Sequence, residues 1–209
     1  GILAGLVTGL FHTFMGIPAI LAGILTQLSL YSVNLKIMGK ANQAINVDKY
    51  DLLVSLRYIK GVPFYRNTIL IVAVIVALLI AALYWFFGTE LGCSIRATGC
   101  NGNMARAQGI NTNFTTVLGL MLSNGLVAFS GALLSQYQGF ADVNMGRGAI
   151  VIGLAAVIIG EVIGGAVLGK YLNFMGRLTF VVVGGVIYYM VLQIVYWLKL
   201  PTDDSKLFT

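Results

Sequence analysis

Residues 69–87 read ILIVAVIVALLIAALYWFF, an apolar run without a single charged side chain. A helix that crosses about 30 Å of hydrocarbon needs roughly 20 residues of this kind. Further runs of similar length and composition cover residues 17–35, 114–134, 150–168 and 178–198. A shorter run at residues 1–14 is long enough for only part of a span. The pattern predicts five full transmembrane helices and a partial one, which together form an all-α, polytopic helical bundle.

The composition of the whole chain agrees with a membrane protein. Of its 209 residues, 58% are hydrophobic and only 10% are charged, and the mean hydropathy is +0.91. Soluble domains carry about 25% charged residues. The net charge of +6 comes from basic residues in the short polar gaps between apolar runs. Because a nucleic-acid binder gathers its basic residues on one solvated face, we expect membrane lipid and no nucleic acid as a partner.

Glycines recur at intervals of four residues in two of the apolar runs. The rows are Gly1, Gly5 and Gly9, then Gly160 with Gly164, and Gly165 with Gly169. Small residues in such rows let two helices approach closely in lipid. A helix that slides against its neighbour is the functional alternative, but packing alone favours plain close contact between helices.

A segment between two of the spans, residues 90–113, carries the residues that point to a function. Its first part, residues 90–111, reads ELGCSIRATGCNGNMARAQGIN and repeats an Arg-Ala pair at Arg96 and Arg106. Apolar Ile95, Met104 and Ile110 would let a short helix rest on another surface while the arginines reach acidic groups. This arrangement is typical of a helix that binds in the groove of a partner protein.

The stretch IRATGCNGNMARAQGIN at residues 95–111 resembles the cytoplasmic coupling loop of permease subunits of bacterial ABC importers. It is closest to the branched-chain amino acid and simple-sugar branch. The resemblance continues through LSNGLVAFSGALLSQYQGFADVNMGRGAIVIGLAAVIIGE at residues 122–161, and back through GIPAILAGILTQLSLYSVNLKIMGKAN at residues 16–42. The chain looks most similar to a subgroup that is paired with binding proteins for tryptophan or related amino acids. We therefore expect residues 1–209 to be a single transmembrane permease domain that lacks further spans before residue 1 and after residue 209.

The resemblance also implies a site, a set of partners and a location. The residues that match the coupling motif would dock into a cleft on a separate ATPase subunit: Arg96, Ala97, Thr98, Gly99, Asn101, Met104, Ala105, Arg106, Gly109 and Ile110. The implied assembly contains a second permease subunit, expected to form a homodimer with the first, two ATPase subunits and an extracytoplasmic solute-binding protein. The ATPase would use ATP and Mg, whereas this chain would bind no cofactor or metal and would not be an enzyme. Its location would be the bacterial cytoplasmic membrane.

A near match to a nucleotide-binding motif does not change this expectation. Residues 164–171 read GGAVLGKY and have the glycine and lysine spacing of a phosphate-binding loop. Tyr171, however, stands where the motif needs Ser or Thr to hold magnesium. The motif also joins a strand to a helix, whereas these glycines close an apolar run. We therefore expect nucleotide hydrolysis to take place in another chain.

The polar segment at residues 136–148, QYQGFADVNMGRG, contains weaker candidates for a functional contact. These candidates are Gln136, Tyr137, Gln138, Asn144 and Met145. They would contact the solute or the protein that delivers it. Alternatively, they are ordinary residues at the outer edge of two helices, which is the favoured interpretation because a site needs a concave pocket.

Glu161 is the only carboxylate inside a predicted span, and ionisable groups inside a membrane are costly enough to suggest a function. It would line the solute pathway or pair with Lys170 or Arg177 near the same end. If the span ends near Gly160, the side chain would instead reach the headgroups. Both interpretations stay open. His12, the sole histidine, has no visible relay partner, which favours a hydrogen-bonded histidine at the interface.

The expected solute is an amino acid, either aromatic or branched-chain, with sugars and nucleosides as alternatives. A secondary transporter is a second alternative. It would need paired intramembrane charges and broken helices in related halves, and only Glu161 fits this description. A membrane-embedded enzyme would need several titratable groups at one depth. His12, Glu161 and the predicted free thiols Cys93 and Cys100 do not converge in the sequence.

The orientation in the membrane involves a conflict. The resemblance places residues 90–113 in the cytoplasm and residues 36–67, expected to be a partly helical surface loop, outside. The cytoplasmic side then holds four basic residues, Arg96, Arg106, Lys170 and Arg177. The outside holds nine, Lys36, Lys40, Lys49, Arg57, Lys60, Arg66, Arg147, Lys199 and Lys206. This distribution runs against the positive-inside tendency, but a coupling loop outside the cell would meet no ATPase, so the cytoplasmic orientation remains our prediction.

Overall fold

The computed structural model describes residues 1–45, 68–146, 148–169 and 173–197. The elements follow in the order α1 (Ile2–Thr13), α2 (Ala19–Met38), β1 (Asn42–Ala44), α3 (Thr68–Phe87), α4 (Glu90–Cys100), α5 (Gly102–Ala107), α6 (Thr112–Gln138), β2 (Phe140–Asp142), α7 (Ala149–Leu168) and α8 (Phe174–Trp197). By length and composition, α2, α3, α6, α7 and α8 can each cross a membrane, and α1 is a shorter apolar helix. The prediction of five full spans and a partial one is confirmed.

The helical bundle predicted from the sequence is confirmed, and the structure adds two short strands to it. Most of the predicted surface loop at residues 36–67 lies outside the described residues, although its first part ends α2 and forms β1. By their contacts, the residues form a first unit (Gly1–Leu78 and Trp85–Met145) and a second unit (Leu79–Tyr84 and Gly146–Thr209). A single domain over residues 1–209 stays a prediction.

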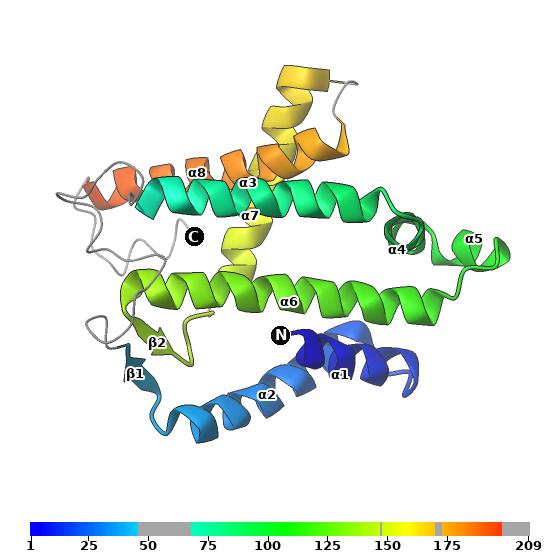
Figure 1. The fold of residues 1–209 in the computed structure, drawn as a ribbon, viewed down its shortest axis with the longest axis horizontal. Helices are drawn as coiled ribbons and strands as arrows, with labels where there is room; N and C mark the ends of the chain where they lie inside the picture. The colour runs from blue at the N-terminus through cyan, green and yellow to red at the C-terminus, as the bar shows by residue number, and fades with distance from the viewer. Residues whose placement is uncertain (46–67, 147, 170–172, 198–209) are drawn as a thin grey trace. The chain divides into compact units, whose positions relative to one another are not determined.

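In the first unit, α1 packs against α6 through the predicted glycine row (Figure 1). A Cβ atom on Gly5 would meet the carbonyl oxygen of Leu120 and lie 2.6 Å from the Cα atom of Met121. At Gly9 it would lie 3.0 Å from the Cα atom of Val117. The two backbones therefore touch where glycine removes the side chain, which confirms the prediction of close packing.

Hydrogen bonds also connect α1 and the turn after it to α2. Lipid tails offer these polar groups no alternative partner. The Thr8 hydroxyl lies 2.9 Å from that of Thr26, and both side chains are buried. At the turn between the helices, Nδ1 of His12 lies 2.9 Å from the carbonyl oxygen of Ile17. The prediction of a hydrogen-bonded histidine is confirmed.

The far end of α6 carries the two-stranded sheet. Gly139 ends the helix in the left-handed conformation, at φ 77°, and its N–H group donates to the carbonyl oxygen of Ser135 at 2.9 Å. The chain then runs antiparallel to β1, with Asn42 opposite Asp142. This sheet lies at the end of α6 opposite to α4 and α5 (Figure 1).

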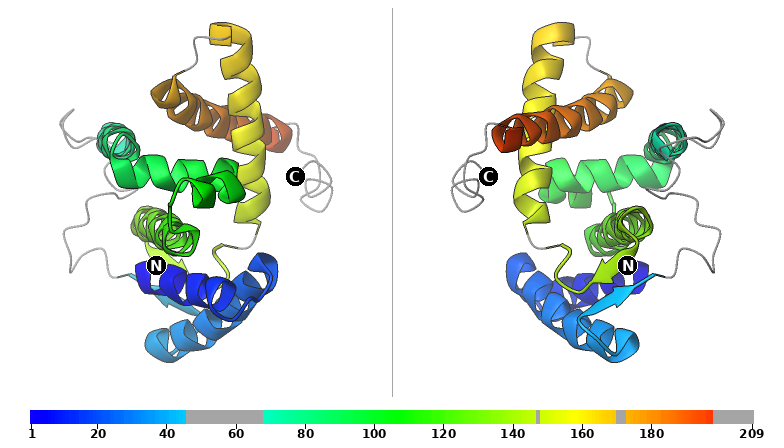
Figure 2. Two further views of the ribbon diagram at one scale, coloured as in Figure 1. Left: turned by 90° about the vertical axis from the view of Figure 1, so that its right-hand side faces the viewer. Right: turned by 90° about the vertical axis from the view of Figure 1, so that its left-hand side faces the viewer.

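In the second unit, α7 and α8 cross at a point where glycines face each other (Figure 2). A Cβ atom on Gly160 would meet the carbonyl oxygen of Phe180, and one on Gly184 would lie 2.6 Å from the backbone nitrogen of Gly160. Gly164 is buried as well. Gly165 and Gly169, in contrast, have open space where a side chain would be, so this pair does not form a packing row.

The described residues have few buried hydrophobic side chains, which are Ala22, Ala105, Ala156 and Tyr188. Large apolar side chains instead cover the outside of the helices; Ile20 is 81% exposed and Ile150 is 84% exposed. Such surfaces are stable against lipid tails, which are as apolar as leucine. The fold is thus held together by backbone contact at glycines and by hydroxyl hydrogen bonds.

Candidate functional site at the α4–α5 end

The turn from α3 into α4 requires glycine at a fixed position. Thr89 caps α4, since its hydroxyl accepts a hydrogen bond from the N–H group of Gly92 at 3.3 Å and donates to the carbonyl oxygen of Phe86 at 2.6 Å. A Cβ atom on Gly92 would lie 2.5 Å from the Cα atom of Phe87. The chain therefore reverses in a tight turn directly at the end of the span.

Helix α4 is attached to the first turn of α6. The hydroxyl groups of Thr98 and Thr115 are 2.8 Å apart, and Thr115 is buried. One turn earlier on α4, the side chain of Ile95 lies 3.5 Å from the place where Gly119 would carry a Cβ atom. These contacts fix one face of α4 on α6 and leave the opposite face open.

Helix α5 is a single short turn with its own caps. The side-chain oxygen of Asn101 accepts from the N–H group of Met104 at 3.1 Å. Ala105, which is only 3% exposed, faces inward. Gly109, at φ 83°, ends the turn, and the N–H group of Ile110 donates to the carbonyl oxygen of Ala105 at 3.0 Å. Glycine is favoured here because other residues adopt a positive φ with strain.

Arg106 connects α5 to the start of α6. Its guanidinium group donates to the Thr112 hydroxyl at 2.9 Å from Nη2 and at 3.3 Å from Nε. Asn111 caps α6, because its side-chain oxygen accepts from the N–H group of Phe114 at 3.2 Å. Asn111 and Arg106 together therefore hold the start of α6 in place.

Seven of the ten residues predicted to dock form an exposed outer surface, which we call the α4–α5 surface: Arg96, Ala97, Gly99, Asn101, Met104, Arg106 and Gly109. The side chain of Met104 is 63% exposed. Residues 91–113 contain two arginines and no acidic residue. The surface thus offers a protruding, adaptable thioether beside positive charge, which suits an apolar pocket with an acidic rim.

The other three predicted residues lie elsewhere. Ala105 is buried, while Thr98 and Ile110 are half-buried. Thr98 bonds to α6, so its role in the structure is to hold the surface in place. Sequence reasoning missed its partner Thr115 and the turn formed by Thr89 and Gly92. A threonine that follows an apolar run and is followed by an acidic residue, here Glu90, is the signal that indicates such a cap.

The second predicted set lies at the opposite end of α6, beside the sheet. Gln136, Tyr137 and Gln138 are the last residues of α6, and Asn144 and Met145 follow β2 in a turn. In this turn the backbone N–H group of Asn144 donates to the Asp142 carboxylate at 2.6 Å. The side-chain oxygen of Gln136 is buried without a hydrogen-bond partner in the part of the chain that the structure describes.

Glu161 belongs to the second unit, where it is exposed on α7. Helix α7 continues from there to Leu168, and both predicted interpretations of Glu161, in the solute pathway or at the headgroups, stay predictions. Arg177 lies in the first turn of α8 and is also exposed. The described residues contain no ion pair between these two side chains. Lys170, the other predicted partner, lies outside the described residues.

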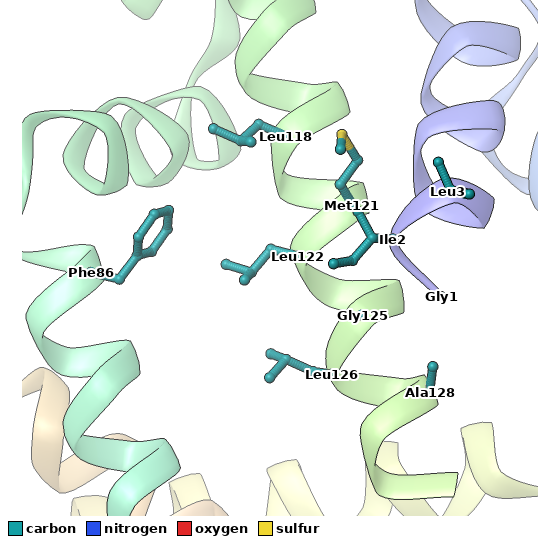
Figure 3. A pocket seen from close by; sticks show the side chains of 10 residues that line it. All are labelled: Gly1, Ile2, Leu3, Phe86, Leu118, Met121, Leu122, Gly125, Leu126 and Ala128. Atoms are coloured by element: carbon teal, nitrogen blue, oxygen red, sulfur yellow. The ribbon is translucent and has the colours of Figure 1, made fainter. Parts of the chain in front are cut away.

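An apolar hollow of about 620 Å³ opens between α1, α6 and the end of α3 in the first unit (Figure 3). Its lining includes Ile2, Phe86, Leu122 and Leu126, and none of the described residues that line it has a charged side chain. Such a lining suits lipid tails or another apolar helix. Apolar side chains of this kind do not orient a polar solute.

These observations define the class of the protein. Five apolar helices of membrane-spanning length and an apolar outer surface are the features of a multi-pass membrane protein.

Comparison with known proteins then gives the family. The family model described as "Branched-chain amino acid transport system / permease component" matches residues 1–209. The chain belongs to this permease family, as the sequence resemblance indicated.

Three relatives illustrate the range of similarity. A tyrosine transport system permease protein of Clostridioides difficile (strain R20291) is 37% identical over 209 residues, which are 100% of this chain and 66% of the relative. An uncharacterized protein of Rickettsia prowazekii (strain Madrid E) is 36% identical over 77% of this chain and 56% of the relative. The autoinducer 2 import system permease protein LsrC of Yersinia pestis (strain Pestoides F) is 28% identical over 82% of this chain and 49% of the relative.

The chain spans from about half to about two-thirds of the length of these curated relatives, all of which are bacterial. No solved structure matches it.

Proposed function

We propose that the chain is the membrane-spanning permease subunit of an ATP-driven importer, and that the α4–α5 surface is its contact with a separate ATPase subunit. The observation that carries this proposal is the exposed pair of arginines around Met104 on two short helices fixed to α6. Within the described residues this surface is exposed, and hydrogen bonds attach both short helices to α6. A rigid exposed helix pair is the form that helix-in-groove recognition needs.

The anchoring contacts suggest how the ATPase would move the membrane helices. A displacement of α4 and α5 would pass to α6 through the Thr98–Thr115 and Arg106–Thr112 hydrogen bonds. Helix α6 would carry α1 with it, because their backbones touch along the glycine row. The bundle would thus have two arrangements whose populations depend on the nucleotide state of the partner.

The proposed partners follow from this role. A second copy of the permease would complete the pathway, two ATPase subunits would bind and hydrolyse ATP with Mg, and an extracytoplasmic binding protein would deliver the solute. The end of α6 that carries Gln136, Tyr137, Gln138, Asn144 and Met145 is the proposed contact for that protein, because it lies opposite the α4–α5 surface. The permease itself would hold no cofactor.

The proposed solute is an amino acid. The tyrosine transport permease covers the whole chain at 37% identity, which supports an aromatic amino acid. A sugar-like solute is the alternative, supported by the weaker similarity to the autoinducer 2 permease.

Charge reversal on the α4–α5 surface tests the proposal. We expect Arg96→Glu and Met104→Glu each to reduce co-purification of the ATPase subunit by about tenfold or more, since a like-charge contact or a buried charge costs several kcal/mol. ATP-dependent uptake of L-tyrosine into proteoliposomes should fall in parallel. Lys40→Glu is the control. It reverses a charge of the same size on an exposed residue that follows the C-terminal end of α2.

A second variant addresses both arginines together. If Arg96→Ala combined with Arg106→Ala leaves ATPase association and uptake at the wild-type level, the α4–α5 surface is not the coupling contact and the proposal is wrong.

A further inference from the structure

Glu161 lies well inside the apolar part of α7. The helix continues for seven residues beyond it, to Leu168, which corresponds to a rise of about 10 Å. Val162, Ile163 and Val167 follow it and are apolar. A carboxyl group at this position is surrounded by apolar side chains of its own helix on both sides.

Among the described residues, the Glu161 side chain lies outside the contact between α7 and α8. Helix α7 contacts α8 through Ala156 and Gly160, and Gly164 on the same face is buried. Glu161 is turned from Gly160 by about 100° around the helix axis, and it is exposed. Among the described residues, no side chain forms a hydrogen bond or an ion pair with its carboxyl group.

The surface beside the carboxyl group is open. Gly165 lies one turn further along α7, where residues at positions i and i+4 are neighbours. A Cβ atom on Gly165 would have no heavy atom within 4 Å. Leu154 and Ile158 precede Glu161 on the same face of α7, and they are 61% and 52% exposed. The carboxyl group therefore stands next to a gap on an otherwise apolar face.

A carboxyl group cannot remain against lipid tails in this position without a large cost. Ionisable residues in spans face a water-filled cavity, another protein group or a bound ligand, and they mark solute pathways. Within its described residues, the second unit supplies no such partner.

We propose that the Glu161 carboxylate, with the gap over Gly165, binds the ammonium group of the solute as it passes through the permease. This inference rests on the proposed transport function and makes its solute class more specific. An amino acid carries a positive ammonium group that can pair with a carboxylate in a low-dielectric site. A sugar or a nucleoside carries no such cation, so Glu161 acts as a selectivity group for amine-bearing solutes.

The first test compares charge variants in the complete transporter, reconstituted in proteoliposomes with its ATPase and binding protein. We expect Glu161→Gln to reduce the initial rate of L-tyrosine uptake by about tenfold or more, because a buried charge pair loses one partner. Glu161→Asp, which keeps the charge, should retain most of the uptake. ATPase association should be unchanged in both variants. Val162→Gln is the control, because it adds a neutral amide at the adjacent exposed position and should transport normally.

The second test measures whether water reaches this position. In a background with Cys93→Ser and Cys100→Ser, we expect a cationic, water-soluble methanethiosulfonate reagent to label Glu161→Cys, and L-tyrosine to slow the labelling. The same reagent should not label Val162→Cys, which points to a different side of the helix.

Each contrary result has a distinct meaning. Uptake by Glu161→Gln within twofold of wild type, or failure of the reagent to label Glu161→Cys, overturns the binding role and leaves the transport function intact. Loss of assembly in Glu161→Gln identifies a structural ion pair and also overturns it. ATP-dependent uptake of D-ribose in place of L-tyrosine would overturn both this inference and the proposed amino acid solute.

Discussion

At the scale of single residues, the fold depends on places where glycine removes a side chain between two backbones. At Gly5 and Gly160, a Cβ atom would meet a backbone carbonyl oxygen of the neighbouring helix. Backbone cannot move aside as a flexible side chain can, so the helices would have to separate. Other glycines on the same helices, such as Gly153, have open space instead. The effect of a substitution therefore depends on the position and not on the residue type.

The substitution Gly160→Ala should destabilise the permease, whereas Gly153→Ala should not. We expect a loss of about 1–3 kcal/mol at Gly160, the usual cost of overpacking a tight contact. At Gly153 the change should be neutral or slightly stabilising, because alanine is the better helix former by about 1 kcal/mol. The midpoint of thermal unfolding of the detergent-purified protein measures both, and equal midpoints for the two variants would contradict the close contact of α7 with α8.

At the scale of elements, α4, α5 and the first turn of α6 form one small assembly held by hydroxyl groups. Thr98 bonds to Thr115, and Arg106 bonds to Thr112, so each short helix has its own attachment to α6. Helices of this length do not persist alone. Their stable conformation is a consequence of capping and of contact with the longer helix, which is why they can transmit a displacement to it.

Removing a hydroxyl of this attachment should weaken coupling without preventing docking. We expect Thr98→Val to lower the amount of solute transported per ATP by about threefold, since a hydrogen bond between membrane helices contributes about 0.6 kcal/mol on average. Thr115→Val should have the same effect, and the double variant should be no worse than either single one. Thr116→Val is the control, because its hydroxyl bonds only to the backbone of its own helix. If Thr98→Val transports as much solute per ATP as the wild type, the displacement of α4 does not pass to α6 through the Thr98–Thr115 hydrogen bond.

At the scale of the whole molecule, α6 separates two groups of residues with different proposed partners. Its 27 residues span about 40 Å, enough to place its ends on opposite faces of a membrane. The turn between α1 and α2 lies at the α4–α5 end, because α1 runs antiparallel to α6 along the glycine row. The sheet of β1 and β2 lies at the other end. The direction in which α6 crosses the membrane decides which partners each of its ends can meet.

Cysteine labelling of intact cells will determine the orientation. In a background with Cys93→Ser and Cys100→Ser, an impermeant maleimide should label Gln43→Cys and should leave Gly102→Cys unlabelled until the cells are opened. Gln43 lies in β1 and Gly102 in α5, so the two positions report opposite ends of the first unit. The reverse result would agree with the positive-inside count and would exclude an ATPase at the α4–α5 surface.

The sequence by itself determined the membrane class, the spans and the position of the segment proposed to dock, because these depend on local composition. Apolar runs 69–87 and 150–168 match α3 and α7 to within a residue at each end, since the backbone of such a run is satisfied in lipid as a helix. The Arg-Ala repeat located the α4–α5 surface. The glycine spacing of four also indicated a contact face on α1.

Only the tertiary structure decided which residues meet. The partner of the α1 glycine row is α6 and not the adjacent α2, and Gly165 lies free although its spacing resembles that of the row. Strands β1 and β2 come from distant parts of the chain and are too short for any alternation to indicate them. The spacing of residues along a helix determines which side chains share a face of that helix. Which other helix covers that face depends on contacts between distant segments, and those exist only once the chain has folded.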